Sequence, residues 1–132
     1  MSILIVDDDP IDRRFLIDAI RVNRPDLSVR YAEDGIKALE VLNSDPLPKL
    51  VLFDVSMPLM NGHAFLRELK SSARLRAIPA IAFSTADTVE EINLCYAESA
   101  NAYLVKPNSI EGYRDAMGRL LSFWFGAVSL AR

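Results

Sequence analysis

Short apolar runs alternate with longer stretches of helical periodicity along the whole chain, and this alternation is typical of folds built from βα units. Strands are predicted at residues 3–6, 27–32, 50–54, 80–84 and 102–106. Three of these runs (ILIV, LVLF and AIAF) are continuously apolar, as expected for parallel strands that helices cover on both faces. The run at 27–32 alternates more, which suits an edge strand. The sequence therefore predicts an α/β fold, a doubly wound five-stranded parallel sheet.

The length and charge of the chain restrict its class further. With 132 residues, 51% of them hydrophobic, the chain has the size of one domain. The formal net charge of −3 offers no general attraction to nucleic acid or to an anionic membrane. One cysteine and one histidine exclude an internal disulfide and a structural zinc site. The first apolar run lacks the features of a secretion signal, so we expect a cytoplasmic protein.

The helical stretches carry apolar stripes, such as Ile11, Phe15, Ala19, Ile20 and Val22 in the first. Asp9, followed by a proline, is predicted to cap that helix, because its side chain can accept from free backbone N–H groups. Asp12, inside the same helix, is expected to face solvent.

Polar residues stand where the predicted strands end, at the edge where ligands bind in such sheets. They are Asp7-Asp8-Asp9, Asp54, Ser84-Thr85 and Lys106. Three carboxylates brought together would repel one another without a cation, and oxygen ligands of this kind suit Mg²⁺. Acids for a metal, a carboxylate nucleophile, a hydroxyl and an ammonium form a complete set for accepting a phosphoryl group.

Each of these residues also has a purely structural interpretation. An acidic triplet can be a loop with a helix cap, Lys106 an ordinary surface lysine, and Ser84 and Thr85 turn formers. His63, alone after Asn-Gly at a predicted helix start, is expected at the surface without a role in phosphotransfer. Cys95 is expected to be a small apolar residue of the fourth helix.

Five motifs in order resemble the receiver domain of bacterial response regulators: ILIVDDDP at 3–10, LFDVSMP at 52–58, NG at 61–62, IAFST at 81–85 and YLVKP at 103–107. The resemblance spans nearly the whole chain. It implies the flavodoxin-like strand order 2-1-3-4-5 and a signalling protein that is not an enzyme. Its implied partner is a histidine kinase, whose phosphohistidine donates to the receiver.

The resemblance assigns roles to individual residues. Asp54 matches the phosphoacceptor. Asp7 and Asp8 match the acidic pair that holds Mg²⁺ together with Asp54 and the backbone carbonyl of Ser56, with Asp7 acting mainly through water. The phosphoryl-stabilising and switch positions are matched by Lys106, Ser84, Thr85 and Tyr103. The fourth helix, fifth strand and fifth helix would form the switched face. A packed strand tyrosine without a switching role is the alternative for Tyr103.

Several residues depart from the pattern of the family. Ser84 stands where threonine is commoner, and Thr85 where a small residue is frequent, so access to an acyl phosphate would be narrower. Ser56 and Ala86 occupy positions whose residues affect the rate of acyl phosphate hydrolysis in the family, so the resemblance does not predict the lifetime of a phosphorylated state.

The C-terminal end carries more aromatic residues than the fifth helix needs. We expect a receiver domain at 1–122 and an aromatic extension of the fifth helix at 123–132 that forms an interface. The expected interface residues are Tyr113, Phe123, Trp124 and Phe125. This ending is similar to that of single-domain regulators associated with bacterial phytochromes. The similarity favours a symmetric dimer and a bacterial phytochrome as the partner histidine kinase. The alternative is that these aromatics fold back on the domain.

Three other functions fit the predicted topology. A flavin binder would need a Ser/Thr/Gly-rich loop after the first strand, and here that loop is acidic. A phosphatase with an aspartate nucleophile would carry a second acid at position 56, which is serine. A receiver-shaped module that works by binding alone would not need the intact acidic pair, Asp54 and Lys106.

Overall fold

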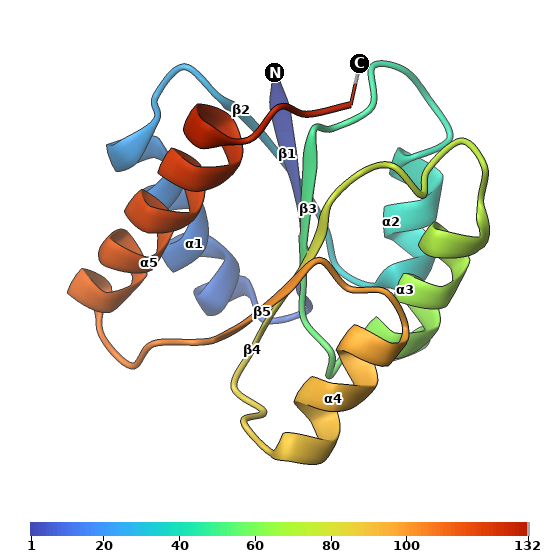
Figure 1. Cartoon of the computed structure of the whole chain (residues 1–132). Coiled ribbons are helices and arrows are strands. Elements are labelled where there is room, and N and C mark those ends of the chain that lie inside the picture. The colour runs from blue at the N-terminus through green and yellow to red at the C-terminus, as the bar shows by residue number, and fades with distance from the viewer. Residues whose placement is uncertain (132) are drawn as a thin grey trace.

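The sheet of this computed structural model, which describes residues 1–131, has five parallel strands in the order β2-β1-β3-β4-β5. The strands are β1 (Ser2–Val6), β2 (Ser28–Ala32), β3 (Leu50–Phe53), β4 (Ala80–Ser84) and β5 (Ala102–Val105). Their carboxyl ends point to the lower edge of the molecule in Figure 1, and both termini lie at the upper edge. The predicted strand order is confirmed, and β2 is an edge strand as expected.

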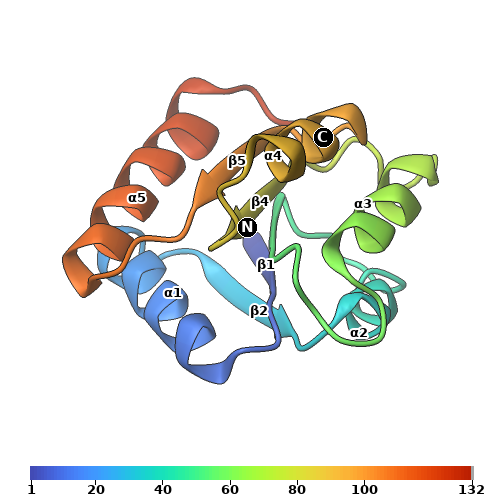
Figure 2. The same cartoon turned by 90° about the horizontal axis from the view of Figure 1, so that it is seen from below.

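Helices cover both faces of the sheet. They are α1 (Pro10–Asn23), α2 (Gly35–Val41), α3 (Gly62–Ser71), α4 (Val89–Ala97) and α5 (Ile110–Ser122), which continues as a short π-helical segment, η1 (Phe123–Ala127). Figure 2 shows α1 and α5 on one side of the sheet and α2, α3 and α4 on the other. The α/β, doubly wound architecture predicted from the apolar runs is therefore confirmed.

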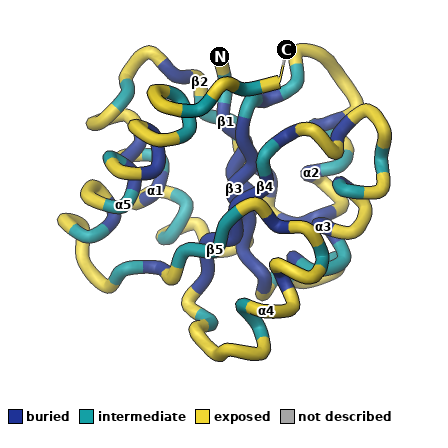
Figure 3. Tube along the Cα trace, viewed as in Figure 1, coloured by how far each residue is buried: buried dark blue, intermediate teal, exposed yellow. Residues whose placement is uncertain are grey.

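The sheet separates two apolar cores. Side chains from α1 and α5 pack on one face, and side chains from α2, α3 and α4 pack on the other. Figure 3 shows buried residues along the central strands and exposed residues on the outer sides of the helices. In α1 the buried residues are Leu16, Ala19 and Ile20, whereas Ile11 and Val22 of the predicted stripe are exposed.

Side-chain caps fix where each helix begins, just after the strand or loop that precedes it. The Asp9 carboxylate accepts from the backbone N–H groups of Ile11 and Asp12, as predicted. The other caps are Asp34, Asn61, Thr88 and Ser109, for α2, α3, α4 and α5. Because each cap satisfies free backbone donors, it holds the loop at the carboxyl edge of the sheet in place.

The C-terminal aromatics do not share one environment. Phe123 is 55% exposed, whereas Trp124 and Phe125 pack against the core between α1, α5 and the sheet. The Arg24 guanidinium lies 5.8 Å from the centre of the Phe125 ring. Trp124 and Phe125 therefore match the alternative in which the C-terminal aromatics fold back on the domain. Arg132, the last residue of the predicted extension, lies outside the described residues.

Tyr113 requires a correction. Only 4% of this residue is exposed, because its ring packs edge-on against Phe83 at 5.6 Å and Phe15 at 5.7 Å. The ring belongs to the core and offers no surface to a partner. Helical spacing places Tyr113 on the stripe of α5 that faces the sheet, and this position explains the burial.

Across residues 1–131, none of the helices combines the length and the apolar character that a membrane crossing needs.

Candidate functional site

The side chain of Lys106 lies at the centre of a cluster at the carboxyl edge of the sheet. Its Nζ donates to Asp7 Oδ2 at 2.7 Å and to Asp54 Oδ2 at 2.8 Å. The lysine side chain is 3% exposed, and the side chains of Asp7 and Asp54 are 4% and 10% exposed. The ends of three strands thus bring together the carboxylates and the ammonium that the sequence placed there.

Backbone hydrogen bonds carry the sheet one residue past its strands at this edge. Asp54 N–H donates to Val6 O at 2.9 Å, and Lys106 N–H donates to Ser84 O at 2.8 Å. The observed strands β3 and β5 end one residue before the predicted ones, at Phe53 and Val105, although hydrogen bonding to the neighbouring strand continues through Asp54 and Lys106. This pairing fixes the direction in which both side chains leave the backbone.

The carboxylates of Asp7 and Asp54 are also oriented by backbone donors. Asp9 N–H donates to Asp7 Oδ1 at 2.9 Å, and Ser56 N–H donates to Asp54 Oδ1 at 3.0 Å. Each carboxylate thus uses one oxygen for a backbone N–H group and the other for Lys106. A carboxylate oxygen can accept more than one bond, so lone pairs stay available for a cation.

Gly62, the first residue of α3, allows the helix to begin directly beside Asp54. A Cβ at position 62 would stand 2.3 Å from Asp54 O and 2.4 Å from Val55 Cα, far inside contact distance. Gly62 N–H also donates to Val55 O at 3.0 Å. The Asn-Gly pair in the sequence thus marks both the cap of α3 and the close approach of its backbone to the site.

The donor set fits a hard divalent cation. Asp7, Asp8 and Asp54 each offer a carboxylate oxygen, and these atoms lie within 4.8 Å of one another. Asp8 is exposed, and in the described part of the chain its side chain makes no hydrogen bond, so its oxygens can meet an ion from solvent. Carboxylate oxygens are preferred ligands of Mg²⁺ and chemically similar ions.

Burial and pairing act in opposite directions on the ionisable groups. Burial raises the pKa of Asp7 more than the hydrogen bonds from Lys106 and Asp9 lower it. Burial alone would lower the pKa of Lys106, but its hydrogen bonds to Asp54, Asp7 and Asp12 outweigh this effect and raise the pKa above its usual value. The lysine is therefore a permanent cation at neutral pH.

Asp12 corrects the expectation of a solvent-facing side chain. Its Oδ2 accepts from Lys106 Nζ at 2.9 Å, and the side chain is 28% exposed. The first turn of α1 lies beside the end of β5, so a side chain expected to point outward from the helix faces the lysine. The sequence signal for this contact is weak, because it depends on how two distant elements pack.

Ser84, Thr85 and Tyr103 lie on the side of the site next to α4. Ser84 is 1% exposed, and its Oγ accepts from Ala86 N–H at 3.3 Å. The Tyr103 hydroxyl donates to Ala86 O at 2.6 Å, and burial raises the pKa of this phenol. Thr85 is exposed. Ala86 thus links the hydroxyl at the end of β4 to the ring on β5.

His63 also departs from the expected surface position, because its side chain is only 13% exposed. Its Nε2 lies 2.7 Å from Glu91 Oε2, and its Nδ1 lies 2.8 Å from Glu98 Oε1. Both glutamates flank or belong to α4, so His63 on α3 bridges the two helices. Arg67 also pairs with Glu98. Cys95, expected as a small apolar residue of the fourth helix, is fully buried and lies beside this cluster.

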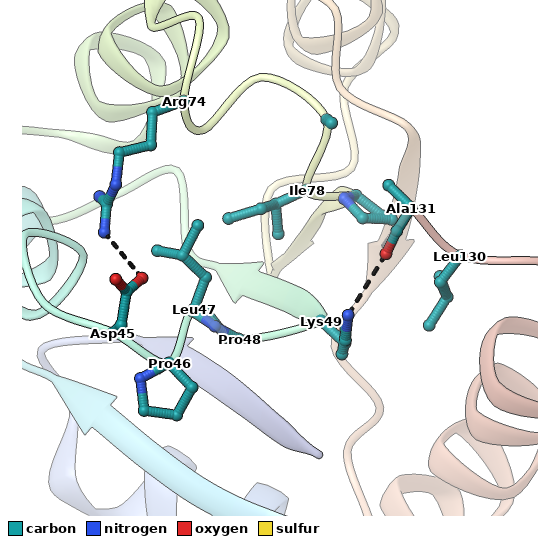
Figure 4. A pocket seen from close by; sticks show the side chains of 11 residues that line it. Asp45, Pro46, Leu47, Pro48, Lys49, Arg74, Ile78, Leu130 and Ala131 are labelled. Atoms are coloured by element: carbon teal, nitrogen blue, oxygen red, sulfur yellow. Dashed lines mark hydrogen bonds and ion pairs between the residues drawn. The ribbon is translucent and has the colours of Figure 1, made fainter.

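Two hollows at opposite ends of the sheet differ in chemistry. One, of about 560 Å³, is lined by Asp8, Ser56, Asn61, His63 and Glu91 among others, and opens onto the acidic cluster. The other, of about 470 Å³, lies before β3 and β4. Figure 4 shows that its two cations are engaged, Arg74 with Asp45 and Lys49 with the backbone oxygen of Ala131. Of these two hollows, the first is therefore the one lined by an acidic side chain without a partner in the described part of the chain, that of Asp8.

Comparisons with known proteins agree with this geometry. Residues 3–117 match the family model described as the response regulator receiver domain. The two-component response regulator ORR5 of Oryza sativa is 34% identical over 105 residues, which cover 80% of this chain and 77% of that protein. The chain spans 66% of the length of another relative, the probable methanogenesis regulatory protein FilR2 of Methanothrix harundinacea, at 32% identity over 74% of this chain.

Solved structures are similar over nearly the full chain. The phosphorylated cyanobacterial phytochrome response regulator RcpA has a TM-score of 0.93 at 25% identity, covering 99% of this chain and 98% of that one. The Mn²⁺-bound form of Rcp1, a response regulator of Synechocystis, has a TM-score of 0.90 at 26% identity and covers 99% of both chains.

Proposed function

Because the chain belongs to the response regulator receiver domain family, we propose that it accepts a phosphoryl group on Asp54 from the phosphohistidine of a histidine kinase. The reaction is Mg²⁺-dependent in this proposal. The observation that carries it is the convergence of Asp7, Asp8 and Asp54 within 4.8 Å at the strand ends, with Lys106 Nζ 2.8 Å from Asp54 Oδ2.

The transfer forms one bond and breaks one. A carboxylate oxygen of Asp54 attacks phosphorus, an O–P bond forms, and the P–N bond of the phosphohistidine breaks with its electron pair passing to the imidazole nitrogen. The transition state of such transfers is loose and asks mainly for positioning and charge stabilisation. Lys106, fixed beside Asp54 and always charged, is placed to donate to a phosphoryl oxygen.

Mg²⁺, held by Asp8, Asp54 and the Ser56 carbonyl with Asp7 behind them, would neutralise part of the negative charge on the phosphoryl group. Support for this assignment comes from the donor set and from the similarity of the chain to the Mn²⁺-bound form of Rcp1. The N–H of Ser56 donates to Asp54 Oδ1 and holds this carboxylate in one orientation.

The acyl phosphate adds roughly one to two negative charges beside the end of β4. The Ser84 hydroxyl can turn toward these oxygens and release the N–H of Ala86, from which it now accepts at 3.3 Å. Since Tyr103 donates to the carbonyl of the same residue at 2.6 Å, movement of Ala86 would free the tyrosine ring. The switched face in this proposal is formed by α4, β5 and α5, with exposed Thr85 at its edge.

We place the protein in the cytoplasm, with a histidine kinase of the bacterial phytochrome type as its partner. The support for this kinase type is the similarity to RcpA, whose name describes it as a phytochrome response regulator. We further propose a homodimer through the α4-β5-α5 side, where Val105 and Phe123 are 46% and 55% exposed. Light scattering at high micromolar concentration should show a dimer, and a monomer with and without a phosphoryl analogue would refute this part.

The proposed reaction is tested by incubating the chain with acetyl phosphate and Mg²⁺ and measuring its intact mass. The native chain should gain the mass of one phosphoryl group, Asp54→Asn should gain none, and a chelator should abolish the gain. Asp45→Asn is the matched control, because that side chain is 84% exposed at the other end of the sheet, and this variant should react like the native chain. An unmodified native chain or a modified Asp54→Asn variant would refute the proposal.

A further inference from the structure

Three carboxylates hold the ammonium of Lys106, and only two of them belong to the metal cluster. Besides Asp7 and Asp54, Asp12 accepts from Nζ at 2.9 Å. Asp12 comes from the first turn of α1, a different element from the strand ends that carry the other two. Its side chain is 28% exposed, compared with 4% for Asp7 and 10% for Asp54.

An ammonium group has three N–H donors, and here each has a carboxylate acceptor. Lys106 therefore has no donor left for an incoming phosphoryl oxygen. At least one of the three hydrogen bonds must break before the lysine can stabilise the transferring group. A cation bound to Asp54 and Asp7 would neutralise part of their charge and weaken their hydrogen bonds to the lysine. Asp12 is not among the residues of the cation site, so its hydrogen bond would not be weakened in this way.

We propose that Asp12 is a positioning residue that restrains Lys106 on the α1 side and thereby slows phosphoryl uptake at Asp54. This inference rests on the proposed function and concerns the regulation of that site. Asp12 competes with the phosphoryl oxygens for the same ammonium, and its negative charge repels the anionic donor. In this way the chain sets its own rate of phosphorylation through a residue that touches neither the metal position nor the attacking oxygen.

Acetyl phosphate provides a balanced reaction in which to measure the effect. An Asp54 oxygen bonds to phosphorus as the bond from phosphorus to the acetate oxygen breaks, and acetate leaves with the electron pair. During this step one N–H of Lys106 passes from a carboxylate to a phosphoryl oxygen. Removing the charge of Asp12 leaves that N–H without a competing anion.

The test compares Asp12→Asn with the native chain by following the gain of phosphoryl mass over time at saturating Mg²⁺. The asparagine variant should react about three to ten times faster, the range expected when one unit charge several ångströms away in a mostly aqueous setting is removed. Asp12→Glu, which keeps the charge, should stay within twofold of the native rate. Asp18→Asn removes a charge from an exposed position of the same helix and is the matched control, also within twofold.

A second readout separates this role from a merely structural one. A distorted site would lose both Mg²⁺ affinity and phosphorylation rate, whereas the proposed role predicts faster phosphorylation while the Mg²⁺ affinity stays equal or falls slightly. Asp12→Asn reacting no faster than the native chain would overturn the inference, as would Asp12→Glu reacting as fast as Asp12→Asn. A native chain that gains no phosphoryl group refutes the proposed function itself, whereas equal rates in native chain and variant refute only the role of Asp12.

Discussion

Replacing Lys106 with methionine should destabilise the chain strongly when no divalent cation is present. Methionine keeps an unbranched apolar side chain of similar length, but the ammonium 2.7 Å from Asp7 and 2.8 Å from Asp54 is lost. Those two carboxylates are buried, so each would be left without a compensating charge. Breaking a buried ion pair from one side costs about 3 to 5 kcal/mol. Because Asp12 is partly exposed and solvent can compensate it, we expect the lower end of this range.

Urea unfolding in the presence of a chelator measures this cost. With a slope of about 2 kcal/mol per molar urea, a loss of about 3 kcal/mol shifts the midpoint down by about 1.5 M. Lys37→Met is the matched control, because Lys37 forms an exposed pair with Glu33 and its loss should change the free energy of unfolding by less than about 0.5 kcal/mol.

Mg²⁺ should then rescue the Lys106→Met variant more than the native chain. Any chain that binds the ion gains about 2.7 kcal/mol at 100 times its Kd. Without the ammonium, the carboxylates bind the ion more tightly, so the difference between variant and native chain should shrink as Mg²⁺ is added. A variant as stable as the native chain in chelator would refute the electrostatic description of the site, and so would a difference that Mg²⁺ leaves unchanged.

Two further predictions concern the contact between α3 and α4. Burial, followed by the charges of Glu91 and Glu98, raises the pKa of the Cys95 thiol to about 11. At pH 8, iodoacetamide should therefore alkylate Cys95 at least tenfold more slowly in the folded chain than in urea, and the rate in the folded chain should rise toward pH 11. Equal rates in the folded and unfolded chain would contradict this burial. His63→Leu removes the bridge to both glutamates and should lower the free energy of unfolding by about 1 to 2 kcal/mol, whereas Glu90→Gln, exposed on α4, should change it by less than about 0.5 kcal/mol; urea unfolding that shows equal effects would argue against the bridge.

The fold could be predicted because its signals are local. Continuous apolar runs identify the central strands, and the Asp9 cap and the Asn61-Gly62 pair identify two helix starts from neighbouring residues alone. Parallel topology then places the strand ends at one edge, so the meeting of Asp54 and Lys106 follows from the order of the elements.

The contacts that the sequence does not predict depend on packing between distant elements. The sequence around Asp12 does not show that the first turn of α1 lies beside the end of β5, where Asp12 contacts Lys106. Likewise, the residues next to His63 in the sequence do not show that Glu91 and Glu98 of the α4 region lie against it. The aromatic character of Tyr113 suggests an interface, although the rotation of α5 buries its ring. Periodicity indicates which side of a helix is apolar, but it does not specify which polar side chains from other elements meet at its edge.

The central claim, that the ends of β1, β3, β4 and β5 form a single phosphoryl-accepting centre, is tested most directly by a crystal structure of the chain with Mg²⁺ and fluoroberyllate, an analogue of the phosphoryl group. We expect the cation at about 2.1 Å from oxygens of Asp8 and Asp54 and from the carbonyl of Ser56, with beryllium on an oxygen of Asp54 and Lys106 donating to a fluoride. A cation bound elsewhere, or an analogue that does not contact Asp54, would contradict the account.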